Sequence, residues 1–333
     1  MASIRRNRSG NWECRVRRRG FPVQTATFDT RAQARDWGNN IEDEISRGRF
    51  VDRHEAETTT VGDALKRYLK EVTPRKRSAD REQRNAKVIL ASPLAAMSLA
   101  AVRSKHVSDF VQSQEDRGVA ANTIRIYLAL ISHLFTVARR EWGIESLANP
   151  VEFARKPRLP VGRTRRLVDD EETQLLGAAS KDLYDAIVIA VETALRRGEL
   201  ARLTWGSVDL VAGTAVIHET KVGEPRTIPL SPRAVAIFNQ RRLADLLTGQ
   251  RHERIFPWRD EGSISHAFAD LCNDLKIEGL CWHDLRHEAT SRLFERGLGL
   301  QEVASVTGHK TWAMLKRYTH PKAADIAKKL TRV

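Results

Sequence analysis

The sequence is poor in the residues that build metal sites and disulfide frameworks. Its 333 residues include only three cysteines, Cys14, Cys272 and Cys281, an odd number without metal-ligand spacing. We therefore expect reduced thiols and no bound metal. The chain has no run of eighteen apolar residues, and its first ten residues, MASIRRNRSG, lack the apolar stretch of a signal peptide. These absences predict a cytoplasmic protein without a membrane partner.

Acidic residues are also in deficit. Lysine and arginine number 56 against 42 aspartates and glutamates, which gives a net charge of +14 and a pI of about 10.1. Residues 1–50 carry +5 and residues 58–160 carry +8, whereas residues 161–333 carry only +3. Surplus arginine can simply keep a surface solvated, but an excess in two N-terminal segments favours a polyanionic partner. Nucleic acid is the expected polyanion, because nothing resembles an amphipathic membrane helix.

The length allows two or three domains, and the hydrophobic pattern predicts a mainly α fold with small β-sheets, the α+β class. The first predicted domain covers residues 1–53 and contains a small three-stranded sheet plus one helix. Asp29-Thr30 is the expected N-cap of that helix. The sheet is expected at residues 3–6, 12–18 and 22–28, and the helix at residues 31–46.

A helical bundle is predicted over residues 58–155, where apolar residues recur at intervals of three and four. The tripeptide Ala121-Asn122-Thr123 is the expected cap of the longest helix. Residues 54–60 and 155–166 are predicted linkers, and the second is basic and contains two prolines, so we expect it to be extended. The expected helices cover residues 61–72, 80–91, 106–117 and 122–142.

The third predicted domain covers residues 165–333 and mixes helices with two short strands. An acidic helix start at residues 168–172 complements the helix dipole, and a further helix is expected at residues 184–195. The strands are expected at residues 214–218 and 226–229, and helices follow them.

Residues 283–287, HDLRH, place His283 and Arg286 on one face of a helix. Taken alone, this pair is typical of a capping histidine beside a surface arginine. His283 and His287 also have a spacing that could hold a metal, but no acidic ligand or cysteine pair completes such a site.

Three other features of this domain are equally ordinary when taken singly. Gly308-His309 follows a short expected helix at residues 301–306 and is typical of a helix stop. Tyr318 is typical of a half-buried anchor. The string TALRRGEL at residues 193–200 adds Arg196, and no glycine-rich phosphate loop or acidic pair lies near it. Together they suit an anionic target attacked by a phenol, because guanidinium groups bind phosphate oxygens and tyrosine can act as a nucleophile.

The order of these strings resembles the tyrosine recombinase, or phage integrase, family. That family shows an arginine box, a lysine in a β-hairpin turn, His-x-x-Arg, Gly-His and a final Arg-Tyr, and all five occur here within residues 193–318. Ala194 stands where glycine is usual, and Arg226 lies in the same hairpin as the matching lysine. The matching segments are residues 193–200, the hairpin TKVGEPRTIPL at 220–230, residues 283–287, Gly308-His309 and Arg317-Tyr318.

The resemblance implies a mechanism and a set of catalytic residues. Tyr318 is the implied nucleophile, which forms a 3′-phosphotyrosyl bond with DNA, and neither cofactor nor metal is needed. Arg196 and Arg286 are implied to stabilise the phosphate. The other implied residues are Lys221 and His283 in proton transfer, His309 as a phosphate hydrogen-bond donor, and Glu199 in support.

The resemblance also implies how the N-terminal segments act. Residues 1–53 resemble the arm-binding domain of lambda-type integrases, and residues 58–155 resemble the core-binding domain. The expected partners are double-stranded DNA attachment sites, a homotetramer on DNA, DNA-bending accessory proteins and an excisionase, in a nucleoid-associated protein of a mobile element. A host-type recombinase that resolves chromosome dimers, a type IB topoisomerase and a catalytically silent DNA-binding regulator are the alternatives. Within residues 1–53, the candidate DNA contacts are Arg5, Arg15, Arg17 and Arg19.

Overall fold

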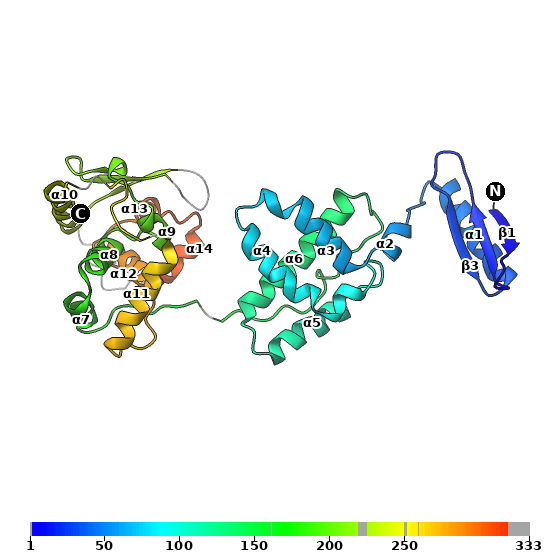
Figure 1. Cartoon of the computed structure of the whole chain (residues 1–333), viewed down its shortest axis with the longest axis horizontal. Coiled ribbons are helices and arrows are strands. Elements are labelled where there is room, and N and C mark those ends of the chain that lie inside the picture. Colours follow the sequence, from blue (N-terminus) through cyan, green and yellow to red (C-terminus); the bar gives the residue numbers. More distant parts are fainter. Residues whose placement is uncertain (1, 161, 219–224, 250–251, 259, 319–333) are drawn as a thin grey trace, which may run out of the picture. The chain divides into compact units, whose positions relative to one another are not determined.

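A computed structural model describes residues 2–160, 162–218, 225–249, 252–258 and 260–318 (Figure 1). The chain divides into two compact units, residues 1–161 and residues 162–333. The division falls within the predicted linker at 155–166. The narrower domain limits 1–53, 58–155 and 165–333 stay predictions.

The chain begins with an antiparallel sheet of three strands in the order β1-β2-β3, covered by helix α1. Thr30 caps the helix as predicted, because its side chain accepts from the N–H of Gln33. Gly38 lets the helix lie close to the sheet, since a Cβ there would come within 2.9 Å of the Cys14 sulfur. The elements are β1 (Ala2–Arg6), β2 (Trp12–Val16), β3 (Gln24–Phe28) and α1 (Arg31–Ser46).

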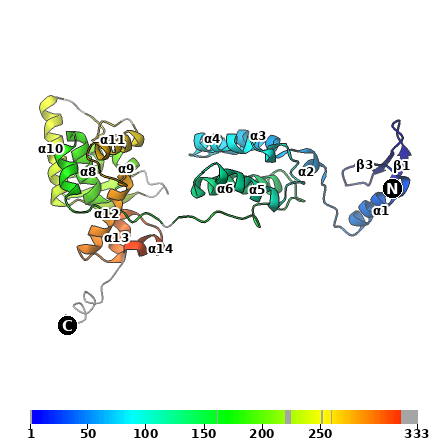
Figure 2. The same ribbon diagram turned by 90° about the horizontal axis from the view of Figure 1, so that it is seen from below.

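The helices that follow bury their apolar faces in one common core. Figure 2 shows two layers, α3 with α4 and α5 with α6. Helix α6 is long and apolar enough to span a membrane by length and composition alone, but its apolar stripe lies in this core. The helices are α2 (His54–Thr58), α3 (Val61–Glu71), α4 (Ala79–Leu90), α5 (Ser104–Asp116) and α6 (Ala121–Arg140).

Two local predictions in this region are wrong. The expected linker at 54–60 contains helix α2, because Ala56 is buried in the bundle core and the Thr58 hydroxyl donates to the carbonyl of His54. The expected cap of α6 is also absent. The N-cap residue is Ala120, which has no side chain to accept a hydrogen bond, so burial of the apolar stripe must stabilise this helix.

Helix α8 forms the centre of the second unit, and α10 and α12 pack against it (Figures 1 and 2). Its residues from Asp185 to Thr193 are all buried. A small antiparallel sheet has the order β4-β5-β6, of which the two-residue β4 was not predicted. The helices are α7 (Glu171–Ala178), α8 (Lys181–Thr193), α9 (Arg197–Ala201), α10 (Pro232–Thr248), α11 (Glu261–Asp274), α12 (Trp282–Glu295), α13 (Leu300–Thr307) and α14 (Trp312–Leu315). The strands are β4 (Val208–Asp209), β5 (Thr214–Ile217) and β6 (Arg226–Pro229), and a 3₁₀ turn, Lys316–Tyr318, follows α14.

Candidate active site

Helix α8 ends in a turn that directs a carbonyl toward helix α12. Ala194 has a φ of 53°, a left-handed conformation that favours glycine and costs a residue with a Cβ about 1–2 kcal/mol. Its carbonyl accepts a 2.5 Å hydrogen bond from Nη1 of Arg286. Alanine at this position therefore keeps both the turn and the backbone contact, although at some cost in strain.

Arg286 is buried, with 4% of its surface exposed. Its Nη2 donates to the carbonyl of Thr307 at 2.5 Å, so carbonyl oxygens hold both ends of the guanidinium group. Within the described residues no carboxylate forms an ion pair with it. Burial and the charge of Arg196 lower the pKa of Arg286 to about 9, which leaves it protonated at neutral pH. A buried cation without a paired carboxylate favours an anionic ligand, because a bound anion offsets the cost of desolvation.

Glu199 joins two further arginines. Its carboxylate accepts two hydrogen bonds from the guanidinium group of Arg226, at 2.9 and 2.7 Å. It also accepts one from Nη1 of Arg196 at 2.8 Å and one from the backbone N–H of Arg196 at 2.9 Å. Burial alone would raise the pKa of Glu199. The hydrogen bonds from Arg226 and Arg196 outweigh burial and lower the pKa to about 2. The carboxylate is thus charged and fixes both guanidinium groups.

Gly308 lies where these arginines approach helix α13. Its carbonyl accepts from Nη2 of Arg196 at 3.0 Å, and Nε of Arg226 donates to the carbonyl of Val306 at 3.1 Å. Gly308 has a φ of 68°, and a Cβ there would lie 3.1 Å from the Arg226 guanidinium. Glycine is therefore required both by the backbone conformation and by the neighbouring arginine.

His309 is neutral, and its hydrogen bonds define its tautomer. The Thr307 hydroxyl donates to the carbonyl of Val303, so Nδ1 of His309, 2.7 Å from that hydroxyl oxygen, must be the donor between them. Its Nε2 then carries a lone pair and faces Nη2 of Arg286 at 3.5 Å. Burial and the charge of Arg286 lower the pKa of His309 to about 3.

Tyr318 reaches this cluster through His287. Its hydroxyl is hydrogen-bonded to Nδ1 of His287, and the two ring centroids are 5.6 Å apart. His309 lies 6.4 Å from the Tyr318 ring. His283 packs edge-on against His287 at 4.8 Å and is the more exposed of the two histidines. Desolvation and the charge of Arg286 lower the pKa of His283.

The described part of the chain contains no group of three or more His, Cys, Asp or Glu side chains that could hold a metal ion. His283 and His287 contact each other edge-on, and Nδ1 of His287 is bonded to a phenol. The described cluster consists mainly of arginine, histidine and tyrosine side chains, with one carboxylate, that of Glu199.

The sequence profile of the phage integrase family matches residues 165–325. Over 278 residues the chain is 37% identical to the shufflon-specific DNA recombinase of Escherichia coli, and the alignment covers 80% of this chain and 70% of that protein. The chain belongs to the phage integrase family. It is a tyrosine-type site-specific DNA recombinase, as the resemblance in its sequence predicted.

Two solved structures share the fold. The Tn1549 transposon integrase in complex with a circular intermediate DNA is 16% identical, with a TM-score of 0.68 over 83% of this chain and 100% of that one. A lambda integrase tetramer bound to a Holliday junction is 22% identical, with a TM-score of 0.63 over 95% of this chain and 94% of that one. The predicted α+β class, mainly helical with small sheets, is confirmed.

The structure brings most of the predicted site residues of the recombinase together. Lys221 lies outside the described residues. Arg226 and His287 are the two cluster members to which sequence reasoning assigned no role. Arg226 could have been identified from the sequence, because the predicted hairpin places it at the start of β6. In the structure it pairs with Ile217 of β5. The cluster that the structure describes contains Arg196, Glu199, Arg226, Arg286, His287, His309 and Tyr318, with His283 beside it.

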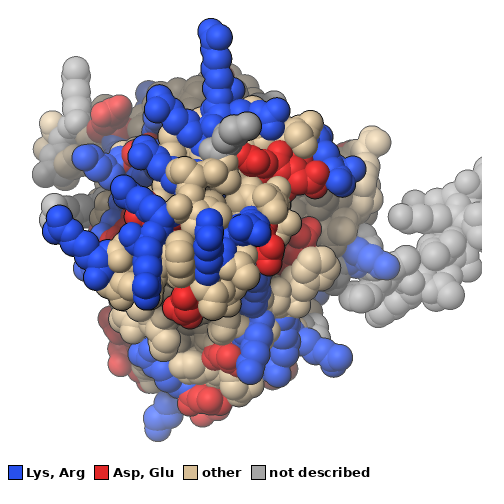
Figure 3. Space-filling model, turned by 90° about the vertical axis from the view of Figure 1, so that its right-hand side faces the viewer, with Lys and Arg blue, Asp and Glu red and all other residues tan. Residues whose placement is uncertain are grey.

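The predicted N-terminal DNA contacts lie in the other unit of the recombinase. Arg5 and Arg15 are exposed on the face of the β1–β3 sheet opposite α1, where Arg5 pairs with Glu13. Arg17 and Arg19 are exposed in the connection between β2 and β3. In Figure 3, many Lys and Arg side chains project from the face that the view shows, with Asp and Glu side chains among them.

Three arginines at the end of the basic linker are engaged by carboxylates instead. Arg163 forms a bidentate pair with Asp284, and Arg166 forms one with Glu288, both on helix α12. Arg165 pairs with Glu171 at the start of α7. The extended linker is thus attached to the helix that carries Arg286.

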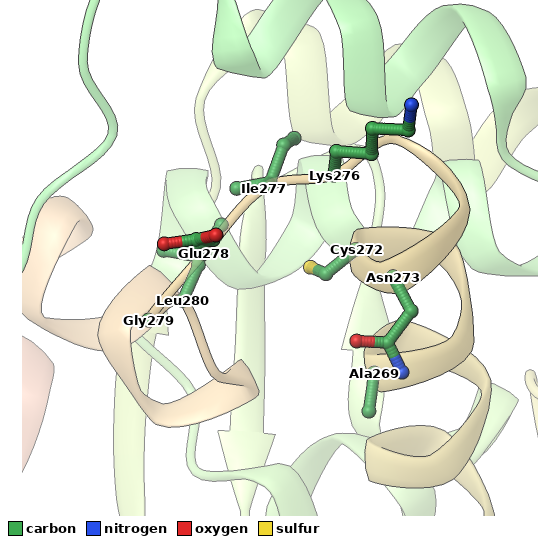
Figure 4. Close-up of a pocket in the computed structure, with 8 residues that line it drawn as sticks. All are labelled: Ala269, Cys272, Asn273, Lys276, Ile277, Glu278, Gly279 and Leu280. Atoms are coloured by element: carbon green, nitrogen blue, oxygen red, sulfur yellow. The ribbon is translucent and has the colours of Figure 1, made fainter.

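Two pockets of this unit are lined wholly or mostly by residues outside the cluster. The larger, of about 490 Å³, is formed by the end of α11 and the following loop and includes no predicted catalytic residue (Figure 4). The smaller, of about 270 Å³, touches Glu199 from the side of β5. Residues that line the larger pocket are Ala269, Cys272, Asn273, Lys276, Ile277, Glu278, Gly279 and Leu280.

Proposed function

We propose that this recombinase is the integrase of a mobile element, such as a prophage or an integrative element, and cuts and rejoins DNA through a 3′-phosphotyrosyl intermediate. The observation that carries the chemistry is Arg286, a buried cation held by two carbonyls, with Arg196 and Tyr318 in the same cluster. Such a cation is held in position to bind a phosphate, and it keeps its charge at neutral pH because its pKa is about 9.

In the proposed reaction the Tyr318 oxygen attacks phosphorus, and the bond to the 5′ oxygen breaks. Arg196 and Arg286 stabilise the charge on the non-bridging oxygens, and Glu199 holds Arg196 in place. Lys221 protonates the departing 5′ oxygen. The phosphotyrosyl bond keeps the energy of the broken bond, so rejoining requires no nucleotide.

His309 is proposed to donate a hydrogen bond to a phosphate oxygen, and His283 to assist proton transfer. In the free protein Nε2 of His309 has no proton, because its Nδ1 is the donor to Thr307. A bound phosphate would raise the low pKa of His309 and favour a proton on Nε2. We therefore expect His309 to gain its donor role only when DNA is bound.

The test is covalent trapping on a nicked suicide substrate. Wild type should yield a DNA-linked peptide that contains Tyr318, and Tyr318→Phe should yield none while its specific DNA binding stays near wild type. Cleavage should continue in EDTA without nucleotide. An adduct at another residue, or activity that vanishes in chelator and returns with magnesium, would refute the proposed chemistry. A protein that binds its site but forms no adduct would be the DNA-binding regulator.

We also propose that the recombinase acts as a homotetramer on two DNA sites, since the lambda integrase of similar fold is a tetramer on a Holliday junction. Residues 1–53 are proposed to bind arm sequences distinct from the crossover site, with DNA-bending proteins and an excisionase as accessory factors and the nucleoid as its location. Deletion of residues 1–50, which keeps helix α2 and its buried Ala56, should spare cleavage of a short core site and cripple recombination of a full attachment site. A footprint confined to the core, unchanged by the deletion, would refute arm binding and favour a host-type recombinase.

DNA inversion is a second candidate, favoured by the 37% identity to a shufflon-specific recombinase. The two activities differ in the arrangement of their sites. On a plasmid with two core sites in inverted orientation, an invertase should efficiently invert the DNA between the sites. An integrase should instead join two sites that lie on separate DNA molecules. Sequencing the products of both substrates decides between them.

A further inference from the structure

His287 has no role in the reaction as proposed above, yet its ring nitrogen is hydrogen-bonded to the oxygen of the proposed nucleophile. Its Nδ1 is hydrogen-bonded to the Tyr318 hydroxyl, and its side chain is buried on α12, directly after Arg286. His283 contacts the His287 ring rather than Tyr318 in the contacts that the structure shows. The two histidines of the HDLRH string therefore occupy different positions relative to the tyrosine.

We propose that His287 is a catalytic residue, the base that accepts the phenol proton of Tyr318 during strand cleavage and returns it during rejoining. The proposal rests on the assignment of Tyr318 as the nucleophile. In the step, the Tyr318 O–H proton moves to Nδ1 of His287 as the oxygen–phosphorus bond forms. The bond from phosphorus to the 5′ oxygen breaks, and that oxygen takes its proton from a different donor. His287 becomes an imidazolium and is neutral again after the reverse step.

The physical need for such a base is clear from the phenol. An unperturbed tyrosine has a pKa of about 10, so only about one part in a thousand is ionised at neutral pH. An imidazole with an ordinary pKa of about 6.5 is well matched to take a proton near neutral pH. To accept at Nδ1, His287 must carry its own proton on Nε2, which fixes the tautomer that the reaction requires.

The groups around His287 are cationic or basic. Arg196 and Arg286 place positive charge in the cluster, and His283 and His309 face the same region with lowered pKa values. A proton that moves to His287 adds one more positive charge to this cluster. A DNA phosphate between the arginines would offset that charge and allow His287 to hold the transferred proton.

The first test compares two variants of full-length protein on the nicked suicide substrate. His287→Asn keeps a hydrogen-bond acceptor near the position of Nδ1 but cannot take a proton, so we expect phosphotyrosyl formation to fall by about 10²-fold or more. His266→Asn on α11, outside the cluster, should leave the rate unchanged. If His287→Asn cleaves at the wild-type rate, a merely positional hydrogen bond is sufficient and the proposal is wrong.

A substrate with a sulfur in place of the 5′ bridging oxygen locates the defect, because a thiolate leaves without a proton. It should restore Lys221→Ala, which lacks the proposed acid, and should not restore His287→Asn. Restoration of His287→Asn would place His287 on the leaving group and overturn the proposal. A failure of Tyr318→Phe to abolish the adduct would instead overturn the proposed nucleophile, so the two failures are distinguishable.

A third measurement keeps His287 intact and therefore does not depend on how its variants fold. Incorporation of a fluorinated tyrosine at position 318 lowers the phenol pKa and reduces the need for a base. Cleavage by wild type should lose its rise with pH through the imidazole range when this tyrosine is present. An unchanged pH profile would contradict proton transfer from Tyr318 to an imidazole.

Discussion

The arginines of the N-terminal sheet and those of the catalytic unit differ in what surrounds them. Arg15, Arg17 and Arg19 are exposed on or beside the sheet, whereas Arg286 is buried and the Arg226 side chain is only 12% exposed. The catalytic unit has many acidic residues, and its 26 basic groups leave a net charge of only +3. Arg226 and Arg286 are held in fixed positions by carboxylate or carbonyl oxygens. The comparison shows that arginine is an exposed surface charge in the N-terminal sheet and a group in a fixed position in the catalytic unit.

Among the substitutions that test this difference between the two sets of arginines, Arg286→Lys should have the largest effect, and it should act on the rate of strand cleavage. A lysine cannot donate to the carbonyls of Ala194 and Thr307 and also present a planar pair of donors to a phosphate. We expect strand cleavage to fall by about 10²–10³-fold or more, as measured by the rate of adduct formation. Arg241→Lys is the matched control, because Arg241 is also largely buried but pairs with Asp182 and Asp185. A similar loss in the control would mean that general packing, rather than the phosphate site, is responsible.

Glu199→Gln should reduce stability by roughly 2–3 kcal/mol, because it removes the charge between Arg196 and Arg226. The folded-state pKa of Glu199 is about 2, below its ordinary value of about 4.5. The contribution of the charged Glu199 carboxylate to the free energy of unfolding is therefore present in full above about pH 4.5 and declines as the pH falls toward 2. Urea unfolding at pH 7 and at pH 3 should show a smaller difference between wild type and variant at pH 3. A difference that grows on acidification would contradict the assigned pKa.

Arg166→Gln should have an intermediate effect, on stability rather than on DNA affinity. It removes two hydrogen bonds from the buried carboxylate of Glu288, which among the described residues keeps those from Arg292 and from the N–H of Leu167. We expect a loss of about 1–2 kcal/mol in urea unfolding and an unchanged salt dependence of DNA binding. Arg158→Gln, an exposed position in the same linker, should leave stability unchanged. A lower salt slope for Arg166→Gln would show that this arginine leaves Glu288 to bind phosphate.

Arg15→Gln should have the smallest effect on the fold, within about 0.5 kcal/mol, because Arg15 lies on the exposed face of the sheet. If residues 1–53 bind arm sequences, the slope of log K against log salt on the full attachment region should fall by about one. The slope on a short core site should stay the same. Equal slopes for wild type and variant on both DNAs would remove Arg15 from the proposed contacts.

The sequence alone was sufficient for features that local chemistry determines. The apolar spacing predicted α3 to α6 within a few residues, Thr30 predicted the start of α1, and residues 226–229 predicted strand β6. The family followed from five short strings in order, because each string keeps its own residue types wherever it lies in space. Boundaries failed where tertiary packing overrides local preference, as in α2 and at the start of α6.

Only the tertiary structure decided which groups meet. His283 and His287 are equivalent in a helical pattern, and the packing of the Lys316–Tyr318 turn against α12 selects His287 as the partner of Tyr318. Arg226 joins Glu199 from 27 residues away, and Arg166 joins Glu288 from 122 residues away. A sequence pattern records side-chain chemistry and its local period, but contacts over such separations depend on how the helices pack around α8. In the same way, the net charge can be calculated from the sequence, but only the structure shows which arginines are buried or paired with carboxylates and which are exposed.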